Sequence, residues 1–252
     1  MSFFKSEQDS HEHSLQTLNW LQEHDDFMGS IGTLIDMGCG SGLDLEWWAT
    51  RTTRDDYKTP LNIQCLGVDV FPYSPVANRY KNTKYISQDF ELPITADQGK
   101  YDVLWSHNSF QYAINPIRTL STWWDLINEN GMAVVIVPQT TNIEFNRQAF
   151  IQTDYCYHNW TIVSLIHALA VSGFDCASGF FLKNPNDPWI HAIVYKSEHP
   201  PMDPRTTKWY DLAEKNLLPK SAAESVNRRG FLAQPDLLLP WIDKSLMGFN
   251  KH

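Results

Sequence analysis

The chain of 252 residues carries 20 Lys and Arg against 29 Asp and Glu, which gives a formal net charge of -9. That acidic balance argues against a general nucleic-acid binder, because affinity for phosphates needs a basic surface. Its 10 Trp, 10 Tyr and 13 Phe argue against a disordered chain, and its length suits one α/β domain with additions or two small domains.

Apolar residues at helical or strand-like spacing divide the chain into alternating elements. Helices are expected at 13–24, from Gly42 onward, at 116–129 and at 161–174. Strands are expected at 33–38, 63–70, 83–93, 101–110, 131–139, 175–183 and 189–197. Strands that alternate with helices form βαβ units, so we predict an α/β fold with a mainly parallel sheet covered by helices on both faces.

The last two predicted strands are joined only by the turn-rich sequence NPNDP. A helical crossover cannot fit in so short a connection, so these strands should form an antiparallel pair. The prediction is a seven-stranded sheet that is parallel except for one antiparallel edge strand. Around this core, residues 31–199, we expect an N-terminal helical segment, 1–30, and a C-terminal helical extension, 200–252.

The C-terminal extension begins around EHPPMDP, whose prolines mark a boundary. Helical pieces are expected around 206–218 and 235–247. The second piece holds large apolar residues that need burial: Leu237, Leu238, Leu239, Trp241 and Leu246. They could pack on the core, cover the substrate mouth or form the face of a homodimer, and the sequence leaves these options open.

The sequence MSFFKSEQDSHEHS contains no apolar signal core, and no later apolar run reaches membrane-spanning length. The cysteines are scattered and form no C-x-x-C pair, so reduced thiols are expected at Cys39, Cys65, Cys156 and Cys176. His11 and His13 lack a third spaced ligand, so no metal site is expected. These features predict a cytoplasmic protein without membrane association.

The stretch TLIDMGCGSGLDLEWW, residues 33–48, turns tightly directly after the first strand. In open α/β sheets ligands bind beyond the carboxyl ends of the strands, and glycine lets a ligand approach the backbone. A dinucleotide fingerprint, G-x-G-x-x-G, would need its last glycine at position 43, which is Leu43. A nicotinamide oxidoreductase is therefore the weaker interpretation of this turn.

The spacing D-x-G-x-G-x-G, from Asp36 to Gly42, resembles motif I of the class I S-adenosylmethionine-dependent methyltransferases. The resemblance continues in order over about residues 31–199, through LGVDV, YISQDFELP, YDVLWSHNSFQYAINPIRTL, LINENGMAVVIVP and WTIVSLIHALAVSGFD. The sequence YDVLWSHNSFQYAINPIRTL is similar to the fourth-strand motif of the small-molecule branch of this family. The resemblance implies a Rossmann-like fold and S-adenosylmethionine (SAM) as the cofactor.

The resemblance also assigns roles around the cofactor. It implies that Asp69 holds the ribose hydroxyls, that Asp89 approaches the adenine amino group and that Phe90 meets the adenine ring. Phe71 and Phe90 could sandwich adenine, although each alone is more typical of a core. Asp36 could orient the loop or meet the ammonium group of the ligand, with a cap of the following helix as the alternative. The full predicted cofactor set is Asp36, Gly38, Cys39, Gly40, Gly42, Asp69, Val70, Gln88, Asp89, Phe90, Ser106 and His107.

Methyl transfer from a sulfonium mainly needs the nucleophile and the methyl group held in line, so no strong catalytic signature is expected. A base is needed only where the acceptor carries a proton. The catalytic candidates are His107, Tyr112 and His158, and many small-molecule members carry His where this chain has Tyr112. The segment 139–158 is long for a plain connection and is interpreted as a substrate lid.

Two motifs typical of nucleic-acid methyltransferases are absent, namely Asn/Asp-Pro-Pro-aromatic after the fourth strand and the Pro-Cys motif of cytosine C5 chemistry. The double-Glu loop of arginine methyltransferases is absent as well. By elimination we expect methyl transfer to O or N of a small-molecule acceptor. A protein methyltransferase and a SAM-binding interaction module without turnover are the alternatives.

Overall fold

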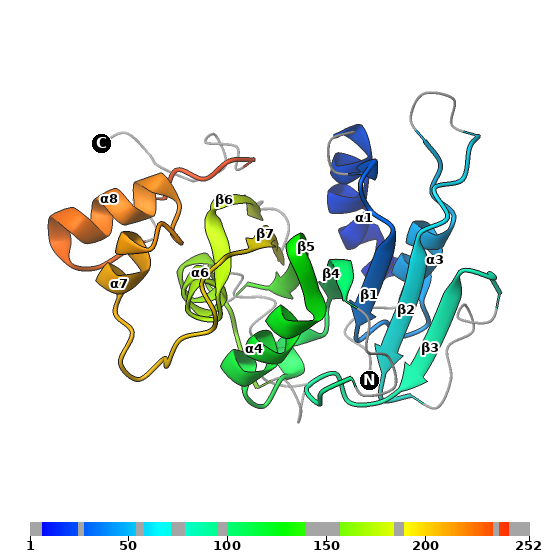
Figure 1. The fold of residues 1–252 in the computed structure, drawn as a ribbon, viewed down its shortest axis with the longest axis horizontal. Coiled ribbons are helices and arrows are strands. Elements are labelled where there is room, and N and C mark those ends of the chain that lie inside the picture. The colour runs from blue at the N-terminus through cyan, green and yellow to red at the C-terminus, as the bar shows by residue number, and fades with distance from the viewer. Residues whose placement is uncertain are drawn as a thin grey trace.

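A computed structural model of the chain describes residues 7–24, 28–53, 58–71, 79–94, 100–139, 157–183, 189–233 and 237–241. The centre of the molecule is a seven-stranded sheet with the strand order β3-β2-β1-β4-β5-β7-β6 (Figure 1). The strands are β1 (Thr33–Met37), β2 (Gln64–Asp69), β3 (Thr83–Ser87), β4 (Tyr101–His107), β5 (Ile127–Pro138), β6 (Phe174–Lys183) and β7 (Trp189–Lys196). The predicted α/β fold is confirmed, because β1 to β5 run parallel and β7 is antiparallel to both neighbours. The antiparallel strand lies one place in from the edge, since β6 pairs along its outer side.

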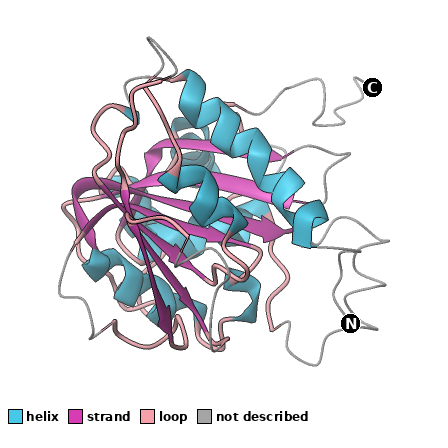
Figure 2. Ribbon diagram, turned by 90° about the vertical axis from the view of Figure 1, so that its right-hand side faces the viewer, coloured by secondary structure: helices cyan, strands magenta, loops and turns pink. Residues whose placement is uncertain are grey.

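Helices cover both faces of the sheet (Figure 2). They are α1 (Glu7–Glu23), α3 (Leu43–Ala49), α4 (Pro116–Leu126), α6 (Ile162–Val171), α7 (Trp209–Glu214) and α8 (Lys220–Arg229), with a 3-10 turn η1 (Phe110–Tyr112). Helix α4 ends before the predicted residue 129, because Ile127 is already extended and pairs with Tyr101 of β4. Among the helices of the described ranges, none has the length and apolar character needed to cross a lipid bilayer.

Local sequence sets where two of these helices begin. The side chain of Asn115 accepts a hydrogen bond from the backbone N–H of Arg118, and Pro116 opens α4, where its missing N–H costs nothing. Thr161 and Ser164 form a capping box at the start of α6. Both helices are therefore fixed at the ends that lie next to the carboxyl edge of the sheet.

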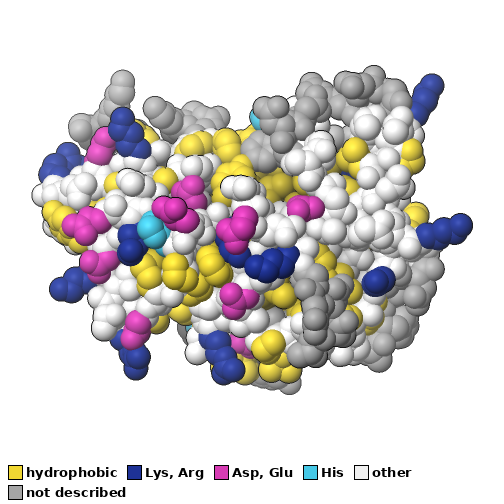
Figure 3. All heavy atoms as spheres, viewed as in Figure 1, with side chains coloured by type: hydrophobic (Ala, Val, Ile, Leu, Met, Phe, Trp, Pro, Cys, Tyr) yellow, Lys and Arg dark blue, Asp and Glu magenta, His cyan; other side chains and the backbone are white. Residues whose placement is uncertain are grey.

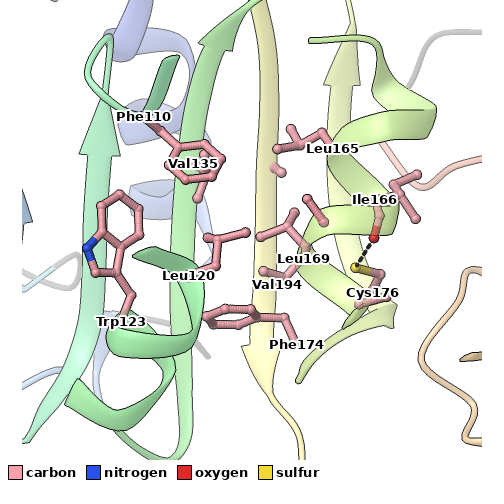
Figure 4. Packing of buried hydrophobic residues seen from close by; sticks show 14 of the residues in the cluster. Phe110, Leu120, Trp123, Val135, Leu165, Ile166, Leu169, Phe174, Cys176 and Val194 are labelled. Atoms are coloured by element: carbon pink, nitrogen blue, oxygen red, sulfur yellow. Dashed lines mark hydrogen bonds between the residues drawn. The ribbon is translucent and has the colours of Figure 1, made fainter. Parts of the chain in front are cut away.

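One face of the sheet packs against α4 and α6 through an apolar cluster (Figure 4). Leu120 and Trp123 of α4 and Leu169 of α6 meet Val135 of β5 and Val194 of β7, and all five side chains are fully buried. Burial of each such side chain stabilises the fold by about 1.5–3 kcal/mol. This cluster holds the central strands, and with them the strand ends that carry the site.

The opposite face packs against α1 and α3. Leu18 of α1 and Trp48 of α3 are fully buried, and the Trp48 ring meets Trp105 of β4 edge-on with centroids 5.7 Å apart. This face also contains buried polar contacts, such as the 2.7 Å hydrogen bond between Thr17 Oγ1 of α1 and His191 Nδ1 of β7. Helix α1 is longer than the predicted 13–24, and it belongs to the folded core.

The C-terminal extension packs on the same apolar cluster as α6. Leu212 of α7 is buried there, together with Leu237 and Leu239. The backbone N–H of Phe181 in β6 donates to the carbonyl of Pro240 at 3.3 Å, so the chain beyond α8 also contacts the outer strand. Of the options that the sequence left open, packing on the core is the one seen in this structure.

Two expectations for this extension need correction. Residues 237–241 are not helical, and 242–247 lie outside the described residues. The sequence pattern did not predict α8, because its buried positions are small or weakly apolar: Ala222, Ser225 and Val226. The remaining helix, α7, lies within the predicted range 206–218.

Candidate cofactor site

Three glycines form the turn between β1 and α3. Gly38, Gly40 and Gly42 have φ angles of +80°, +52° and +88°, which glycine adopts more readily than other residues. A Cβ at Gly38 would lie 2.2 Å from the Cβ of Ser109, whereas a Cβ at Gly40 would meet nothing within 4 Å. Gly38 therefore permits close packing on the loop after β4, and Gly40 borders open space that a ligand can occupy.

Asp69 holds this turn from the neighbouring strand. The side chain is buried at the end of β2. Its Oδ2 accepts a hydrogen bond from the Gly40 N–H at 2.8 Å, and its Oδ1 accepts one from the Phe71 N–H at 3.2 Å. A carboxylate has about four lone-pair sites, so Asp69 can still accept hydrogen bonds from hydroxyl groups of a ligand.

The predicted residues after β3 lie beside Asp69. The Gln88 backbone N–H donates to the Asp69 carbonyl at 2.8 Å. The Gln88 side-chain amide donates to carbonyls of the following loop, that of Pro93 among them at 3.1 Å. Asp89 Oδ1 accepts from the Glu91 N–H at 2.9 Å. This stretch of backbone therefore places the expected adenine end of the site next to the expected ribose end.

Phe71 and Phe90, the two aromatic residues predicted to contact adenine, have different surroundings. Phe71 follows the exposed Val70 just beyond β2, and its own side chain is 59% exposed. Phe90 is half-buried and packs on the core, with its ring centroid 5.9 Å from that of Trp123. Phe71 therefore offers a free ring beside Asp69, whereas one side of Phe90 is occupied by the core.

Asp36 is the buried acid at the end of β1. It is 1% exposed, and its Oδ2 has no hydrogen-bond partner among the described residues. Burial, and then the carboxylates of Asp44 and Asp69, raise the pKa of Asp36 well above its usual range. Gly42 is the N-cap of α3 and no side chain caps it, so the alternative of Asp36 as a helix cap is wrong. An unpartnered buried acid instead fits a site for a cationic group.

Cys39 lies within the glycine turn as a half-buried free thiol. Burial, and then the carboxylates of Asp36 and Asp69, raise its pKa, so the thiol stays protonated and is a poor nucleophile. Cys65 and Cys176 are buried free thiols, while Cys156 lies outside the described residues.

Asp44 is a buried carboxylate on α3, directly after the glycine turn. The sequence motifs assign it no role. Its Oδ1 accepts hydrogen bonds from His11 Nδ1 and, at 2.6 Å, from Ser14 Oγ, both on α1. Its Oδ2 accepts from Trp105 Nε1 and from His107 Nδ1 of β4, each at 2.9 Å. Asp44 therefore joins α1, α3 and β4 at the carboxyl edge of the sheet.

His107 is the predicted residue at the end of β4. It is 9% exposed, and while Nδ1 contacts Asp44, Nε2 is buried without a hydrogen-bond partner among the described residues. The ring meets Trp189 of β7 edge-on at 5.7 Å. Of the catalytic candidates, His107 is the one that the described hydrogen bonds pair with a carboxylate.

Ser106, the preceding residue of β4, is fully buried. Its Oγ lies 2.8 Å from Ser109 Oγ, and Ser109 Oγ donates to the Met37 carbonyl at 2.6 Å. These bonds tie the loop after β4 to the end of β1. Ser106 therefore helps to hold that loop, next to Gly38, whose missing side chain permits the close packing.

The other two catalytic candidates lie at η1. Tyr112 is half-buried in η1 itself. The backbone N–H groups of Tyr157 and His158 both donate to the Gln111 carbonyl at 3.1 Å, which brings His158 next to this turn. No described hydrogen bond links either candidate to the Asp44 cluster around His107. The rest of the predicted lid, residues 140–156, lies outside the described residues.

Sequence reasoning missed Asp44 and its partners His11, Ser14 and Trp105. A local signal existed, because an acid in the first turn of a helix after a glycine turn is a candidate for a site. The histidines of HEHS were weighed only as metal ligands, whereas one of them in fact binds this acid.

Comparison with known proteins gives one family match and many matches in fold. Residues 35–135 match the family described as "Methyltransferase domain". A search of curated protein sequences finds no match.

Three solved structures illustrate the likeness in fold. The first, a protein crystallised with the Trm112 methyltransferase activator of Haloferax volcanii, has 16% identity and a TM-score of 0.53, over 75% of this chain and 95% of that one. The plantazolicin methyltransferase BpumL, solved with a pentazolic desmethylPZN analog and SAH, has 15% identity and a TM-score of 0.54, over 76% of this chain and 89% of that one. The 1,6-didemethyltoxoflavin-N1-methyltransferase of Burkholderia thailandensis, with bound 1,6-didemethyltoxoflavin and S-adenosylhomocysteine, has 13% identity and a TM-score of 0.52, over 71% of this chain and 76% of that one.

A glycine turn where the strand order reverses, between β1 and β4, with acids after β1 and β2, defines a Rossmann-like ligand-binding domain. Residues 35–135 match the methyltransferase-domain family, in agreement with the predicted family. The chain is accordingly a methyltransferase, and SAM is its cofactor. The site fits that cofactor, since Gly40 borders open space and the buried Asp36 Oδ2 has no hydrogen-bond partner in the part of the chain that the structure describes.

A recess of about 1090 Å³ lies away from this site, between the ends of β6 and β7 and the C-terminal extension. Asp175, Lys196 and Asp211 are among its lining residues. Figure 3 shows acidic and basic side chains side by side over this part of the molecule. Lys196 Nζ is already bound to the Ile127 carbonyl at 3.0 Å, and Asp203 is already paired with Arg205, so the recess has the character of a solvated polar surface.

Proposed function

We propose that the chain transfers a methyl group from SAM to an oxygen or nitrogen atom of a small-molecule acceptor. The observation that carries the proposal is the meeting of three groups at adjacent strand ends. Asp36 of β1, Asp69 of β2 and His107 of β4 are all buried there, beside a glycine turn with open space at Gly40. Asp36 Oδ2 and His107 Nε2 are buried and have no hydrogen-bond partner within the described ranges, and such atoms are typical of binding and catalytic sites.

Each residue of the cradle has a role in holding the cofactor. The carboxylate of Asp69 accepts the ribose hydroxyls in charge-assisted hydrogen bonds. The carboxylate of Asp36 receives the ammonium group of the methionine part, which removes the cost of leaving a buried acid unpaired. Asp89 and the exposed ring of Phe71 stand at the adenine end. Gly40 lets the ligand lie close to the backbone.

His107 is the proposed general base for an acceptor that carries a proton. Bound SAM supplies a methyl carbon whose bond to sulfur breaks as the new C–O or C–N bond forms, with the electron pair left on sulfur. The acceptor's proton moves to His107 Nε2. Because that atom is shielded, with Trp189 against the ring and His13 of α1 against Trp189, the acceptor reaches it only after one of these elements shifts. Tyr112 and His158 at η1 are secondary candidates.

A small-molecule acceptor is supported by the fourth-strand motif and by two of the structures with the same fold. One of those structures contains 1,6-didemethyltoxoflavin, and the other is a complex with a pentazolic desmethylPZN analog. The site itself is a buried cluster of imidazole, indole and carboxylate groups, and burial suits a compact acceptor better than an extended polymer.

Calorimetry with SAM and, separately, with NADH tests the proposal. We expect SAM to bind and Asp69→Ala to weaken binding by about 10- to 100-fold, because hydrogen bonds to a charged group are lost. Asp125→Ala, which removes an exposed carboxylate from α4, is the matched control and should bind like the unaltered chain. Binding of NADH alone would contradict the assignment. A screen of metabolite extracts with methyl-labelled SAM then tests turnover and the acceptor class.

A further inference from the structure

We propose that Asp44 is a positioning residue of the methyl-transfer site: it fixes the ring of His107 in the tautomer with hydrogen on Nδ1, so that Nε2 receives the acceptor's proton. The inference rests on the proposed function and names the residue on which its general base depends. This role is supported by the contacts of Asp44, by their geometry and by the titratable groups around them.

The first step is the charge of Asp44. Burial alone would raise its pKa, but the pairing with His107 and the hydrogen bonds from His107, His11 and Ser14 outweigh burial and lower the pKa of Asp44 below its usual range. The side chain is therefore an ionised carboxylate at neutral pH. An ionised carboxylate only accepts hydrogen bonds, so each neighbour must donate.

The second step is geometry. Four donors meet the two oxygens of Asp44: His11 Nδ1 and Ser14 Oγ at Oδ1, and Trp105 Nε1 and His107 Nδ1 at Oδ2. The indole N–H of Trp105 is a fixed donor on the rigid strand β4. With all lone-pair sites used and the partners divided between α1 and β4, the carboxylate has one orientation, and this orientation holds the imidazole of His107.

The third step is the consequence for His107. Because Nδ1 donates to Asp44, the neutral ring carries its lone pair on Nε2, the buried atom without a partner among the described residues. When the acceptor's proton moves to Nε2, the ring becomes an imidazolium and its charge is balanced by the carboxylate 2.9 Å away. The acceptor's freed electron pair forms the bond to the methyl carbon, and the old bonding pair stays on sulfur.

The surrounding titratable groups are compatible with this assignment. On α1, His11 contacts the same carboxylate. On β1, Asp36 has a raised pKa, which favours its neutral form and limits the negative charge near Asp44. In the glycine turn, Cys39 is held protonated. On β2, the carboxylate of Asp69 contributes to the raised pKa of both Asp36 and Cys39. On β7, the indole of Trp189 faces the imidazole of His107.

The test is a nitrogen NMR spectrum of the histidine rings in the full chain labelled with ¹⁵N-histidine, recorded at neutral pH. His107→Gln assigns the His107 signals by their loss. In the unaltered chain we expect a protonated Nδ1 and an unprotonated Nε2 at His107. A ring with hydrogen on Nε2 overturns the inference, and this reading needs no variant of Asp44 to fold.

Asp44→Asn keeps the shape of the side chain and removes its charge. We expect the ratio of the Nδ1–H to the Nε2–H tautomer of His107 to fall about tenfold, because a hydrogen bond to a charged acceptor becomes one to a neutral acceptor. Trp105→Phe is the matched control, since it removes another donor from the same Oδ2 atom and should leave the tautomer unchanged. An unchanged ratio in Asp44→Asn, or an equal change in Trp105→Phe, contradicts the role.

Calorimetry of the unaltered chain with SAM separates the two proposals. SAM binding together with hydrogen on Nε2 of His107 overturns the role of Asp44 and leaves the proposed function in place. Absence of SAM binding removes the proposed function, and the inference with it, whatever the tautomer.

Discussion

The two faces of β1 and β4 differ although the same short strands form both. Toward α4 and α6 the strands present Ile35, Met37 and Leu104, which are fully buried in one apolar cluster. Toward α1 and α3, the same strands place Asp36 and His107 among apolar neighbours. Successive side chains of a strand point to opposite faces, so one strand can supply both.

The apolar face contributes to the stability of the fold, whereas the other face contributes the polar groups for binding and chemistry. The apolar face gains free energy from burial and needs no polar partners. The other face buries acids and imidazoles, which is unfavourable unless each polar atom finds a partner. Asp44 has its partners within the chain, whereas Asp36 Oδ2 and His107 Nε2 have none among the described residues. A substitution on the apolar face should therefore lower stability without changing SAM affinity, whereas a substitution of the unpartnered acid Asp36 should change both.

The largest loss of stability is expected from Asp44→Ala. The change leaves donors on two elements, α1 and β4, without an acceptor. We therefore expect the free energy of unfolding to fall by about 3–5 kcal/mol in urea titrations. Asp102→Ala is the matched control: that carboxylate also accepts several hydrogen bonds, such as the one from Gly32 N–H at 2.9 Å, but it is only half-buried. Equal losses in the two variants would contradict the importance of burial.

The pH dependence of Asp44 has a definite sign. Its pKa is lowered in the folded chain, so its contribution is complete above the ordinary carboxyl pKa and is lost as the pH falls through the lowered folded value. The unaltered chain should therefore lose stability in acid more steeply than Asp44→Ala.

On the apolar face, Leu169→Ala should lower stability and leave SAM affinity nearly unchanged. Leu169 is fully buried beneath α6, so the cavity should cost about 2–5 kcal/mol of unfolding free energy. Affinity for SAM, measured by calorimetry well below the unfolding temperature, should stay within about twofold, because Asp36 and His107 lie on the opposite face. A large loss of affinity would show that the two faces are coupled.

A smaller effect, of opposite sign, is expected from Asp36→Asn. Replacing the unpartnered buried acid by a neutral amide should raise the unfolding free energy by about 1–2 kcal/mol at neutral pH while SAM binding weakens. The pKa of Asp36 is raised in the folded chain, so its favourable contribution is complete in acid and is lost as the pH rises through the folded value. The advantage of the variant over the unaltered chain should therefore grow with pH.

The smallest expected effect is a proton released on SAM binding. The ammonium group selects the ionised form of Asp36, so affinity should rise with pH up to the raised pKa of this acid and then level off. Calorimetry in buffers with different ionisation enthalpies measures the release as a fraction of one proton. Asp36→Asn should remove the release, and an unchanged value would assign it to another group.

Sequence alone predicted the parts of the molecule whose signals are local. The strand and helix patterns gave the parallel sheet, and the spacing of Gly38, Gly40 and Gly42 with Asp69 indicated the cofactor turn. The boundary between α4 and β5 was misplaced, because pairing of Ile127 with β4 outweighs the helical pattern around it. Tertiary pairing of this kind cannot be read from periodicity.

The Asp44 cluster could not be predicted in the same way. Its hydrogen bonds join residues 33, 30, 61 and 63 positions apart, so only the folded sheet brings them together. Asp36 was recognised from its motif, but its lack of a partner depends on burial, which the motif does not report. The exposed Phe71 and the half-buried Phe90 were likewise indistinguishable by residue type.

The contact between Phe181 and Pro240 affects how the molecule behaves at high concentration. An outer strand with free N–H and C=O groups is a template on which a neighbouring chain can add another strand and start a fibre. The turn around Pro240 occupies part of that template on β6, and a proline ring has no N–H with which to extend the ladder. The turn around Pro240 therefore hinders edge-to-edge aggregation through β6.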